Sequence, residues 1–153
     1  MTIIRALTTA DLDVICDHRA RMFLEAGRAA PDVQAMAAPF RAWLEPRLSD
    51  GRYFGFMAEA RGRIVAGVGL MELDWPPHPA HPVESRRGYV LNVFVEQEFR
   101  RRKIAQALMD AAETEFRSRN LGYLILHATR QGAPLYESMG WRATSEMSKL
   151  LFQ

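Results

Sequence analysis

The sequence predicts an α/β fold of the α+β kind: a mixed central sheet, mostly antiparallel with one parallel strand pair, flanked by helices. Residues 53–60 and 64–73 are two β-prone runs separated by a short turn, which predicts an antiparallel hairpin. Residues 89–95 and 123–126 are apolar runs on either side of an amphipathic segment, 104–116. A strand, helix, strand order favours a right-handed crossover between two parallel strands. The chain is therefore expected to combine both kinds of pairing in one sheet.

The composition narrows the class of protein. The 153 residues are 48% hydrophobic and 25% charged, which suits a single domain over residues 1–153 with a substantial core. No apolar run approaches the roughly 18 residues of a membrane span, and the first residues lack a secretory signal pattern. The one cysteine, Cys16, favours a reducing cytoplasm. A net charge of +2 is too balanced to argue for nucleic acid. We therefore expect neither membrane nor nucleic-acid partners.

The N-terminal third predicts one strand and two helical segments. Residues 3–7 are β-prone, and Thr8 offers a capping hydroxyl with an acid three residues on, so a helix should begin there and stop at Gly27. A second helical pattern begins at Pro31. Because Pro39 lacks a donor and would interrupt an interior turn, we expect this second segment to form two pieces.

Two features follow near the end of the second hairpin strand. Glu72 places a carboxylate there, and a solvated strand terminus is the simpler interpretation. Residues 74–82 contain four prolines and are expected to form a stiff loop. Such loops often line substrate sites, and Trp75, His78 and His81 would be suitable contacts, although the loop is also compatible with a dimer contact or a surface excursion. Two histidines alone make a weak metal site, so no metal is expected.

The run from Arg100 to Lys103 places four cations at the start of the predicted helix 104–116. A helix N-terminus already carries roughly +0.5 charge, so this cluster should cost stability unless an anion is present. The amides of the first turn point outward and can bind phosphate, so amides, helix dipole and side chains would converge on one anionic group. A solvated basic turn is the alternative, and the charge pattern alone does not decide between them.

The C-terminal part predicts a loop, a short helix and a last strand. Residues 129–132 are expected to form the loop, and residues 133–139 the helix, which Gly140 ends. Residues 146–152 alternate enough in polarity to predict a final strand.

Two separate motifs carry a resemblance to a known family. The coenzyme-binding loop of that family has the pattern Gln or Arg, any two residues, Gly, any residue, then Gly or Ala. In this sequence Arg100 and Ala105 match the first and last positions, and Lys103 occupies the position of the glycine. The run 134–141, Pro-Leu-Tyr-Glu-Ser-Met-Gly-Trp, looks like the family's short helix with its Leu-Tyr-Glu and following Gly-aromatic pattern. In this order and separation, the motifs resemble those of the GCN5-related N-acetyltransferase (GNAT) family over essentially the whole chain.

The resemblance implies where acetyl-coenzyme A (acetyl-CoA) would bind. The backbone of Val93, Phe94 and Val95 would pair with the pantetheine arm in the manner of a strand. Amides of the following loop and helix would hold the pyrophosphate; these belong to Arg100, Arg101, Arg102, Lys103, Ile104, Ala105 and Gln106. The Lys103 side chain would hinder backbone approach, restrict a loop that needs positive φ, or add a charge contact to phosphate.

The resemblance also implies an N-acetyltransferase that moves the acetyl group of acetyl-CoA, its co-substrate, to a primary amine. The acceptor would be a small molecule or an exposed amino group, and the amine would attack directly. Tyr136 is the implied general acid for the leaving thiolate, and a strand amide near Val93 would polarise the thioester oxygen. Glu72 is our candidate for the base.

Other functions are open at this point. A non-catalytic acyl-CoA-binding sensor or interaction module is the main alternative, motivated by Lys103 and by the lack of an assured base. A nucleic-acid binder is disfavoured because the cations form one short cluster. The identity of the acceptor is not readable from the sequence, and the resemblance adds a homodimer as one option for the oligomeric state.

Overall fold

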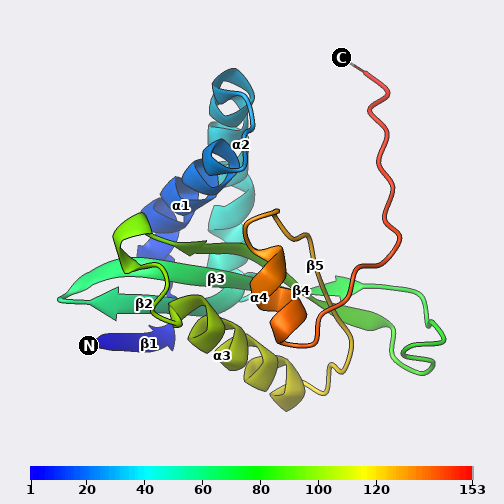
Figure 1. Ribbon diagram of the computed structural model, residues 1–153. Helices are drawn as coiled ribbons and strands as arrows, with labels where there is room; N and C mark the ends of the chain where they lie inside the picture. The colour runs from blue at the N-terminus through cyan, green and yellow to red at the C-terminus, as the bar shows by residue number, and fades with distance from the viewer. Residues whose placement is uncertain (153) are drawn as a thin grey trace.

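The computed structural model describes residues 1–152, and within them a single mixed sheet forms the centre (Figure 1). The strands lie in the order β1-β2-β3-β4-β5. Pairings along the first four strands are antiparallel, and β4 pairs with β5 in parallel. Their bounds are Thr2–Ala6 for β1, Phe54–Ala60 for β2, Arg63–Asp74 for β3, Arg86–Val95 for β4 and Leu124–Leu126 for β5. The predicted fold class is confirmed.

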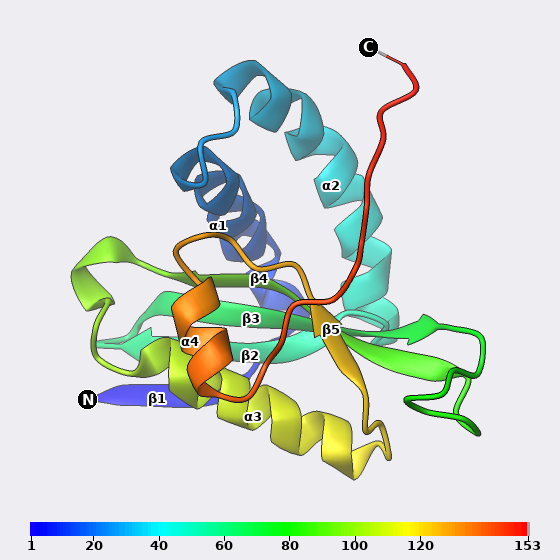
Figure 2. The same cartoon turned by 45° about the vertical axis from the view of Figure 1, so that its right-hand side comes forward.

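Helices cover both faces of the sheet (Figure 2). Helices α1 (Leu12–Glu25) and α2 (Ala30–Asp50) pack on one face, while α3 (Ile104–Ser118) and α4 (Ala133–Ser138) lie on the other. Each face has its own apolar cluster. The α1/α2 cluster includes Ile15, Phe40, Leu44, Leu48, Tyr53 and Met57, and the α3/α4 cluster includes Val68, Leu70, Val90, Leu108, Phe116 and Tyr136. Among residues 1–152 no helix has the length and apolar character needed to cross a bilayer.

The first helix begins where the sequence predicts. Thr8 and Asp11 form a reciprocal capping box around a short 3-10 turn, Thr9–Asp11, that leads into α1. The Asp11 carboxylate also receives two hydrogen bonds of 2.9 Å from the Arg5 guanidinium. These bonds, together with the backbone amide of Thr8, lower the pKa of Asp11 although its burial opposes the shift. The ion pair ties β1 to the entry of α1.

The predicted hairpin is present as β2 and β3. Its turn holds Arg61 and Gly62 at φ 53° and 77°, so both central residues occupy the left-handed region that a tight two-residue turn requires. The predicted split of the second helix, in contrast, is wrong. Helix α2 runs unbroken through Pro39 and Pro46. Both prolines lie on its exposed side, where water can satisfy the carbonyl groups that lose their amide partners, while the buried side holds the helix in place.

The proline-rich loop lies at the end of the β3–β4 hairpin where Asp74 pairs with Arg86. Its aromatic residues enclose a buried cation. The Arg87 guanidinium lies 4.1 Å from the Trp75 ring centroid and 4.5 Å from that of Tyr123, and its Nε donates to His81 Nε2 at 2.9 Å. Two of the loop side chains proposed as substrate contacts, Trp75 and His81, thus cover Arg87, and the third, His78, stacks on His81 with ring centroids 5.6 Å apart.

The predicted strand over residues 146–152 is wrong. After α4 the chain continues from Trp141 to Phe152 with neither helix nor strand, and Figure 1 shows this segment running away from the body. An extended segment becomes a strand only when another strand supplies its hydrogen-bond partners, and the alternating sequence does not provide that neighbour.

Candidate active site

The parallel strands β4 and β5 separate partway along their length. Their pairing ends at Val90 and Leu126, after which β4 continues to Val95 paired only with β3, so its other edge is open. A cleft of about 880 Å³ lies beyond this point. Its walls come from the end of α1, from β4 at residues 93–95, from the start of α3, and from the loop and helix over residues 129–136. The cleft therefore joins the two motif regions that the sequence singled out.

A bulge in β4 precedes the part of the strand whose β5-side edge is open. The register passes from the pair Gly69 and Leu91 to the pair Gly67 and Phe94, so a single β3 residue faces both Asn92 and Val93. Asn92 has φ 55°, in the left-handed region. Such a bulge interrupts the ladder and redirects the local backbone groups. The resemblance to the family implies that the amide that would polarise a thioester oxygen lies here, near Val93.

The start of α3 has the backbone shape of a glycine-containing loop. Arg101 and Lys103 adopt φ values of 64° and 62°. Lys103 is the N-cap, and its carbonyl accepts the first helical hydrogen bond, from the Ala107 amide at 3.1 Å. The amides of the three residues between them have no acceptor within the helix and remain available to an anion. Lys103 thus adopts the left-handed conformation that favours glycine, the residue that the family motif has at this position.

The four cations at this helix start play different parts. Arg100 donates from Nε to the Val95 carbonyl at 2.8 Å and from a terminal nitrogen to the Glu25 carboxylate at 2.6 Å. It therefore locks the end of β4 to the end of α1 along the cleft wall. The Arg102 guanidinium lies 5.2 Å from the Phe99 ring centroid. The side chains from residue 101 to residue 103 are exposed. Five predicted coenzyme residues line the cleft: Val93, Phe94, Val95, Arg100 and Ala105.

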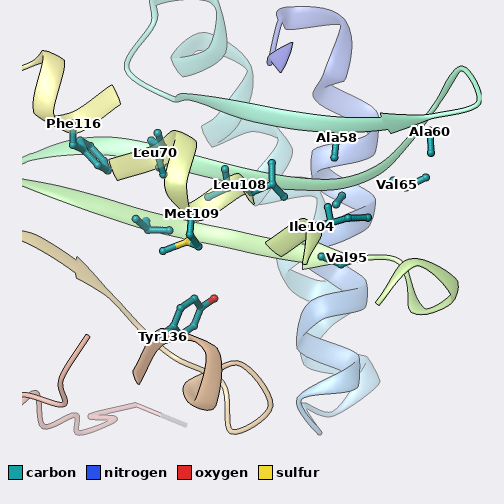
Figure 3. Close-up of a cluster of buried hydrophobic side chains, with 14 of the residues drawn as sticks. Ala58, Ala60, Val65, Leu70, Val95, Ile104, Leu108, Met109, Phe116 and Tyr136 are labelled. Carbon is teal, nitrogen blue, oxygen red and sulfur yellow. The ribbon is translucent and has the colours of Figure 1, made fainter. Parts of the chain in front are cut away.

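Tyr136 also lines this cleft, from helix α4. Figure 3 shows its ring turned from α4 toward β4, and the residue is 8% exposed. The Thr129 hydroxyl accepts the Gly132 amide at 3.1 Å, which fixes the loop before this helix. Burial raises the pKa of Tyr136 to about 12. The phenol is therefore protonated at neutral pH and can donate a proton or a hydrogen bond.

Glu72, the residue predicted as base, is not among the residues that line the cleft. Its two carboxylate oxygens bind different guanidinium groups, that of Arg86 at 2.7 Å and that of Arg119 at 3.3 Å. These ion pairs connect the end of β3 with β4 and with the residue that follows α3. The side chain is partly buried in this arrangement, with 28% of its surface exposed.

The opposite side of β4 carries a polar cluster that the sequence did not reveal. Asn92 accepts a 2.7 Å hydrogen bond from the Arg19 guanidinium and donates a 2.9 Å bond to the buried Tyr53 hydroxyl. Arg19 also lies over the rings of Phe23 and Phe40. Burial lowers the pKa of Arg19 and raises that of Tyr53. The only signal available was Arg19 itself, a cation interrupting an apolar helix face.

A second polar group lies just past the end of β5. The Tyr89 hydroxyl is 3.0 Å from His127 Nδ1, and the other ring nitrogen of His127 contacts the Glu146 carboxylate. Burial raises the pKa of Tyr89. His127 follows the last residue that pairs with β4, so this group stands where the two strands separate. The three residues are far apart in the sequence, and no local motif connects them.

Comparison with known proteins gives a consistent result. A family model described as the acetyltransferase (GNAT) family matches residues 13–141. A crystal structure of a GCN5-related N-acetyltransferase from Ralstonia eutropha JMP134 is 51% identical, with 99% of each chain covered and a TM-score of 0.97. A predicted acetyltransferase from Clostridium acetobutylicum with acetyl-CoA is 22% identical, with 98% of this chain and 96% of that chain covered and a TM-score of 0.83.

An aminoglycoside acetyltransferase from an uncultured soil metagenomic sample is 19% identical, with 100% of this chain and 99% of that chain covered and a TM-score of 0.74. At these lower identities the likeness concerns the fold alone. None of the curated proteins matches the sequence.

Proposed function

The chain belongs to the acetyltransferase (GNAT) family, and from that premise we propose that it moves the acetyl group of acetyl-CoA to a primary amine by direct attack, with Tyr136 as the general acid. The acceptor is a small molecule or an exposed amino group. Acetyl-CoA supplies the activated acetyl thioester for this reaction. The proposed reaction uses no metal ion.

The observation that carries the proposal is a single cleft reached by both motif regions. One wall offers the unpaired edge of β4 at residues 93–95, and Tyr136 lies in the other. An extended pantetheine arm can accept and donate hydrogen bonds along such an edge, as an added strand does. The free amides at the start of α3 and the cations beside them suit a pyrophosphate. A volume of about 880 Å³ is within the range of small-molecule sites.

Three residues or backbone groups have distinct tasks in this proposal. The amine lone pair forms the new C–N bond at the carbonyl carbon while the backbone amide near Val93 donates to the carbonyl oxygen as it gains charge. The C–S bond then breaks, and Tyr136 gives its proton to the departing sulfur. The proton released by the amine passes to a base. Bulk solvent afterwards restores the phenol.

Two residues are candidates for that base. Glu72 is the one proposed from the sequence, and both its oxygens are held by arginines. His127 lies where β4 and β5 separate, between the Tyr89 hydroxyl and the Glu146 carboxylate. The pH dependence of turnover distinguishes them, because the variant that lacks the true base loses the acidic limb of the profile. Glu72→Gln and His127→Gln are the matched pair for this comparison.

The test is turnover across a panel of amines, measured by release of free thiol. We expect the native chain to acetylate at least one amine and Tyr136→Phe to bind coenzyme A equally well with turnover at least tenfold lower, as removal of a general acid predicts. Tyr123→Phe is the control, because Tyr123 lies at the far end of the sheet beside Arg87.

An unchanged rate for Tyr136→Phe would remove Tyr136 as the acid. Binding of coenzyme A without turnover of any amine would favour the non-catalytic sensor. No increase in thermal stability with either coenzyme A or acetyl-CoA would contradict the proposed cleft.

A further inference from the structure

The polar cluster on the α1/α2 face of the sheet has no role in the acetyl-transfer proposal. The side chain of Asn92, in the bulge of β4, joins Arg19 of α1 to Tyr53. Tyr89 lies on the same face of β4, because Leu91, two residues further on, packs against the α1/α2 cluster. The cluster therefore stands where β4 and β5 separate, next to the open edge of β4.

Arg19 is a half-buried cation, and within residues 1–152 it forms no ion pair with a carboxylate. Other arginines that are partly covered do form such pairs. Arg5 binds Asp11 with 32% of the arginine side chain exposed, and Arg100 binds Glu25 with 25% exposed. Burial lowers the pKa of Arg19. A cation that has lost water without gaining a counter-ion costs free energy, which an arriving anion recovers.

One edge of the Arg19 guanidinium has no hydrogen-bond acceptor. Nη1 donates to Asn92 Oδ1 at 2.7 Å. Nε is enclosed without a partner, and Nη2 is accessible and makes no hydrogen bond within the described part of the chain. Nε and Nη2 together form the fork that binds both oxygens of a carboxylate. The accessible Nη2 is the point of contact for such a ligand, and Nε is the second donor.

Two aromatic rings hold this guanidinium in a fixed orientation. Its central carbon lies 4.9 Å from the ring centroid of Phe23 and 4.5 Å from that of Phe40. Stacking on rings pre-organises the fork, and the apolar surroundings strengthen its attraction for a negative charge. The hydrogen bond to Asn92 also steadies the bulge of β4. Arg19 is therefore placed both to bind an anion and to support the strand, and an experiment has to separate these roles.

The charges around Tyr89 set an orientation for a ligand that carries both an amine and a carboxylate. Burial raises the pKa of Tyr89, the charge on Arg19 lowers it, and the charge on Glu146 raises it again. The Tyr89 hydroxyl is 3.0 Å from His127, which contacts Glu146. A carboxylate is therefore attracted to the Arg19 end and an amine to the His127 end, since the reverse order brings like charges together. His127 comes two residues before Thr129, which lines the proposed coenzyme cleft.

We propose that the acceptor is a small amino carboxylate, and that Arg19 determines this specificity by binding its carboxylate through Nη2 and Nε. The inference rests on the proposed acetyl transfer and adds the chemical class of the acceptor to it. Arg19 offers one planar fork and one positive charge, which match the two oxygens and single charge of a carboxylate. A phosphate carries up to two negative charges, more than one guanidinium balances.

The test compares α-, β- and γ-amino acids with their carboxamides, which lack only the negative charge. For the native chain we expect kcat/KM to be about tenfold or more higher for the best amino acid than for its carboxamide, mainly through KM. Arg19→Gln should reduce this ratio to about one, and Arg19→Lys, which keeps the charge but not the fork, should give an intermediate ratio. Arg41→Gln is the matched control. Arg41 lies on α2, is 48% exposed and pairs with Asp13, so its loss should leave the ratio unchanged.

The outcomes separate specificity from support of the strand. If Arg19→Gln lowers kcat/KM for both acceptors by the same factor, Arg19 only supports the bulge and the proposal is overturned. A native chain that prefers the carboxamide, or an amine with a phosphate in place of the carboxylate, overturns it too.

Calorimetric titration of amino acids into the protein saturated with coenzyme A tests the carboxylate site without turnover. Binding to the native chain that is lost in Arg19→Gln would support the site even if no amine is acetylated, in which case the acetyl-transfer proposal alone fails. Absence of binding to the native chain would overturn the inference.

Discussion

Substitution of Lys103 by glycine tests how the proposed coenzyme loop tolerates lysine at the position where the family motif has glycine. Lys103 is exposed and holds φ 62° and ψ 21° as the N-cap of α3. This left-handed conformation costs a residue with a Cβ atom roughly 1–2 kcal/mol. Glycine removes that cost but loses about 0.5–1 kcal/mol more conformational entropy on folding. The net expectation for Lys103→Gly is a gain of about 0.5–1 kcal/mol in the free energy of unfolding.

The assay is thermal unfolding of Lys103→Gly beside Lys103→Ala. For a domain of this length a change of 1 kcal/mol shifts Tm by about 2–4 °C, so glycine should raise Tm by about 1–4 °C. Alanine removes the same charge from the helix N-terminus but keeps the Cβ atom, so the difference between the two variants isolates the backbone term. Equal Tm values for the two variants, or a lower Tm with glycine, would refute the reasoning.

The same pair separates two of the three effects proposed for the Lys103 side chain, the charge contact to phosphate and the hindrance of backbone approach. If the ammonium group contacts phosphate, both variants weaken coenzyme A binding. If the Cβ atom hinders close approach of the backbone, only glycine strengthens it. Titration calorimetry of the two variants with coenzyme A measures these changes in affinity directly.

Three further predictions concern packing, pH and charge. Gly88→Ala should lower Tm by several degrees, because overpacking costs about 1–3 kcal/mol and the new Cβ atom would lie 2.5 Å from the Leu124 side chain and 2.9 Å from the Phe116 ring. Gly122→Ala is the control, since no atom lies within 4 Å of a Cβ atom at that position. Burial lowers the pKa of His18 below its unfolded value of about 6.5, so the unfolded state binds more protons. Stability should therefore fall as the pH drops below about 6.5, by up to about 1.4 kcal/mol per pH unit, and urea unfolding of His18→Gln should show a flatter profile. Arg102→Glu should weaken coenzyme A binding about tenfold or more, because a charge-assisted hydrogen bond is worth about 1.5–3 kcal/mol. Arg117→Glu, at the far end of α3, is the control and should leave binding unchanged. Equal losses for the two variants in a binding titration would assign the effect to net charge.

Local patterns in the sequence were sufficient for most of the fold. The Thr8 and Asp11 cap, the tight turn at Arg61 and Gly62, and the strand, helix, strand order before residue 127 are all present. Each depends on contacts within a few residues or on one buried face with a regular period, and such information is written along the chain. The motifs around Arg100 and Tyr136 likewise indicated the family before any geometry was known.

Two predicted features, the split in the second helix and the strand over residues 146–152, were wrong because both depend on contacts with residues distant in the sequence. Pro39 does interrupt a hydrogen bond, but α2 continues because neighbouring residues bury one side of the helix against α1 and the sheet. Residues 146–152 have the alternation of a strand, but within one copy they have no strand beside them. Helix continuity and strand pairing were both decided by what packs alongside, which a propensity does not contain.

The candidate site likewise depends partly on local sequence patterns and partly on tertiary contacts. The sequence by itself determined that a buried strand, a basic helix start and a downstream tyrosine motif occur in an order typical of one family. Only the tertiary structure decided that Val93 and Tyr136 share a cleft, that Arg101 and Lys103 take the left-handed backbone conformation, and that Glu72 is held between two arginines. The physical reason is that shared burial and ion pairing depend on distances between residues far apart in the chain, and these distances exist only once the sheet has assembled.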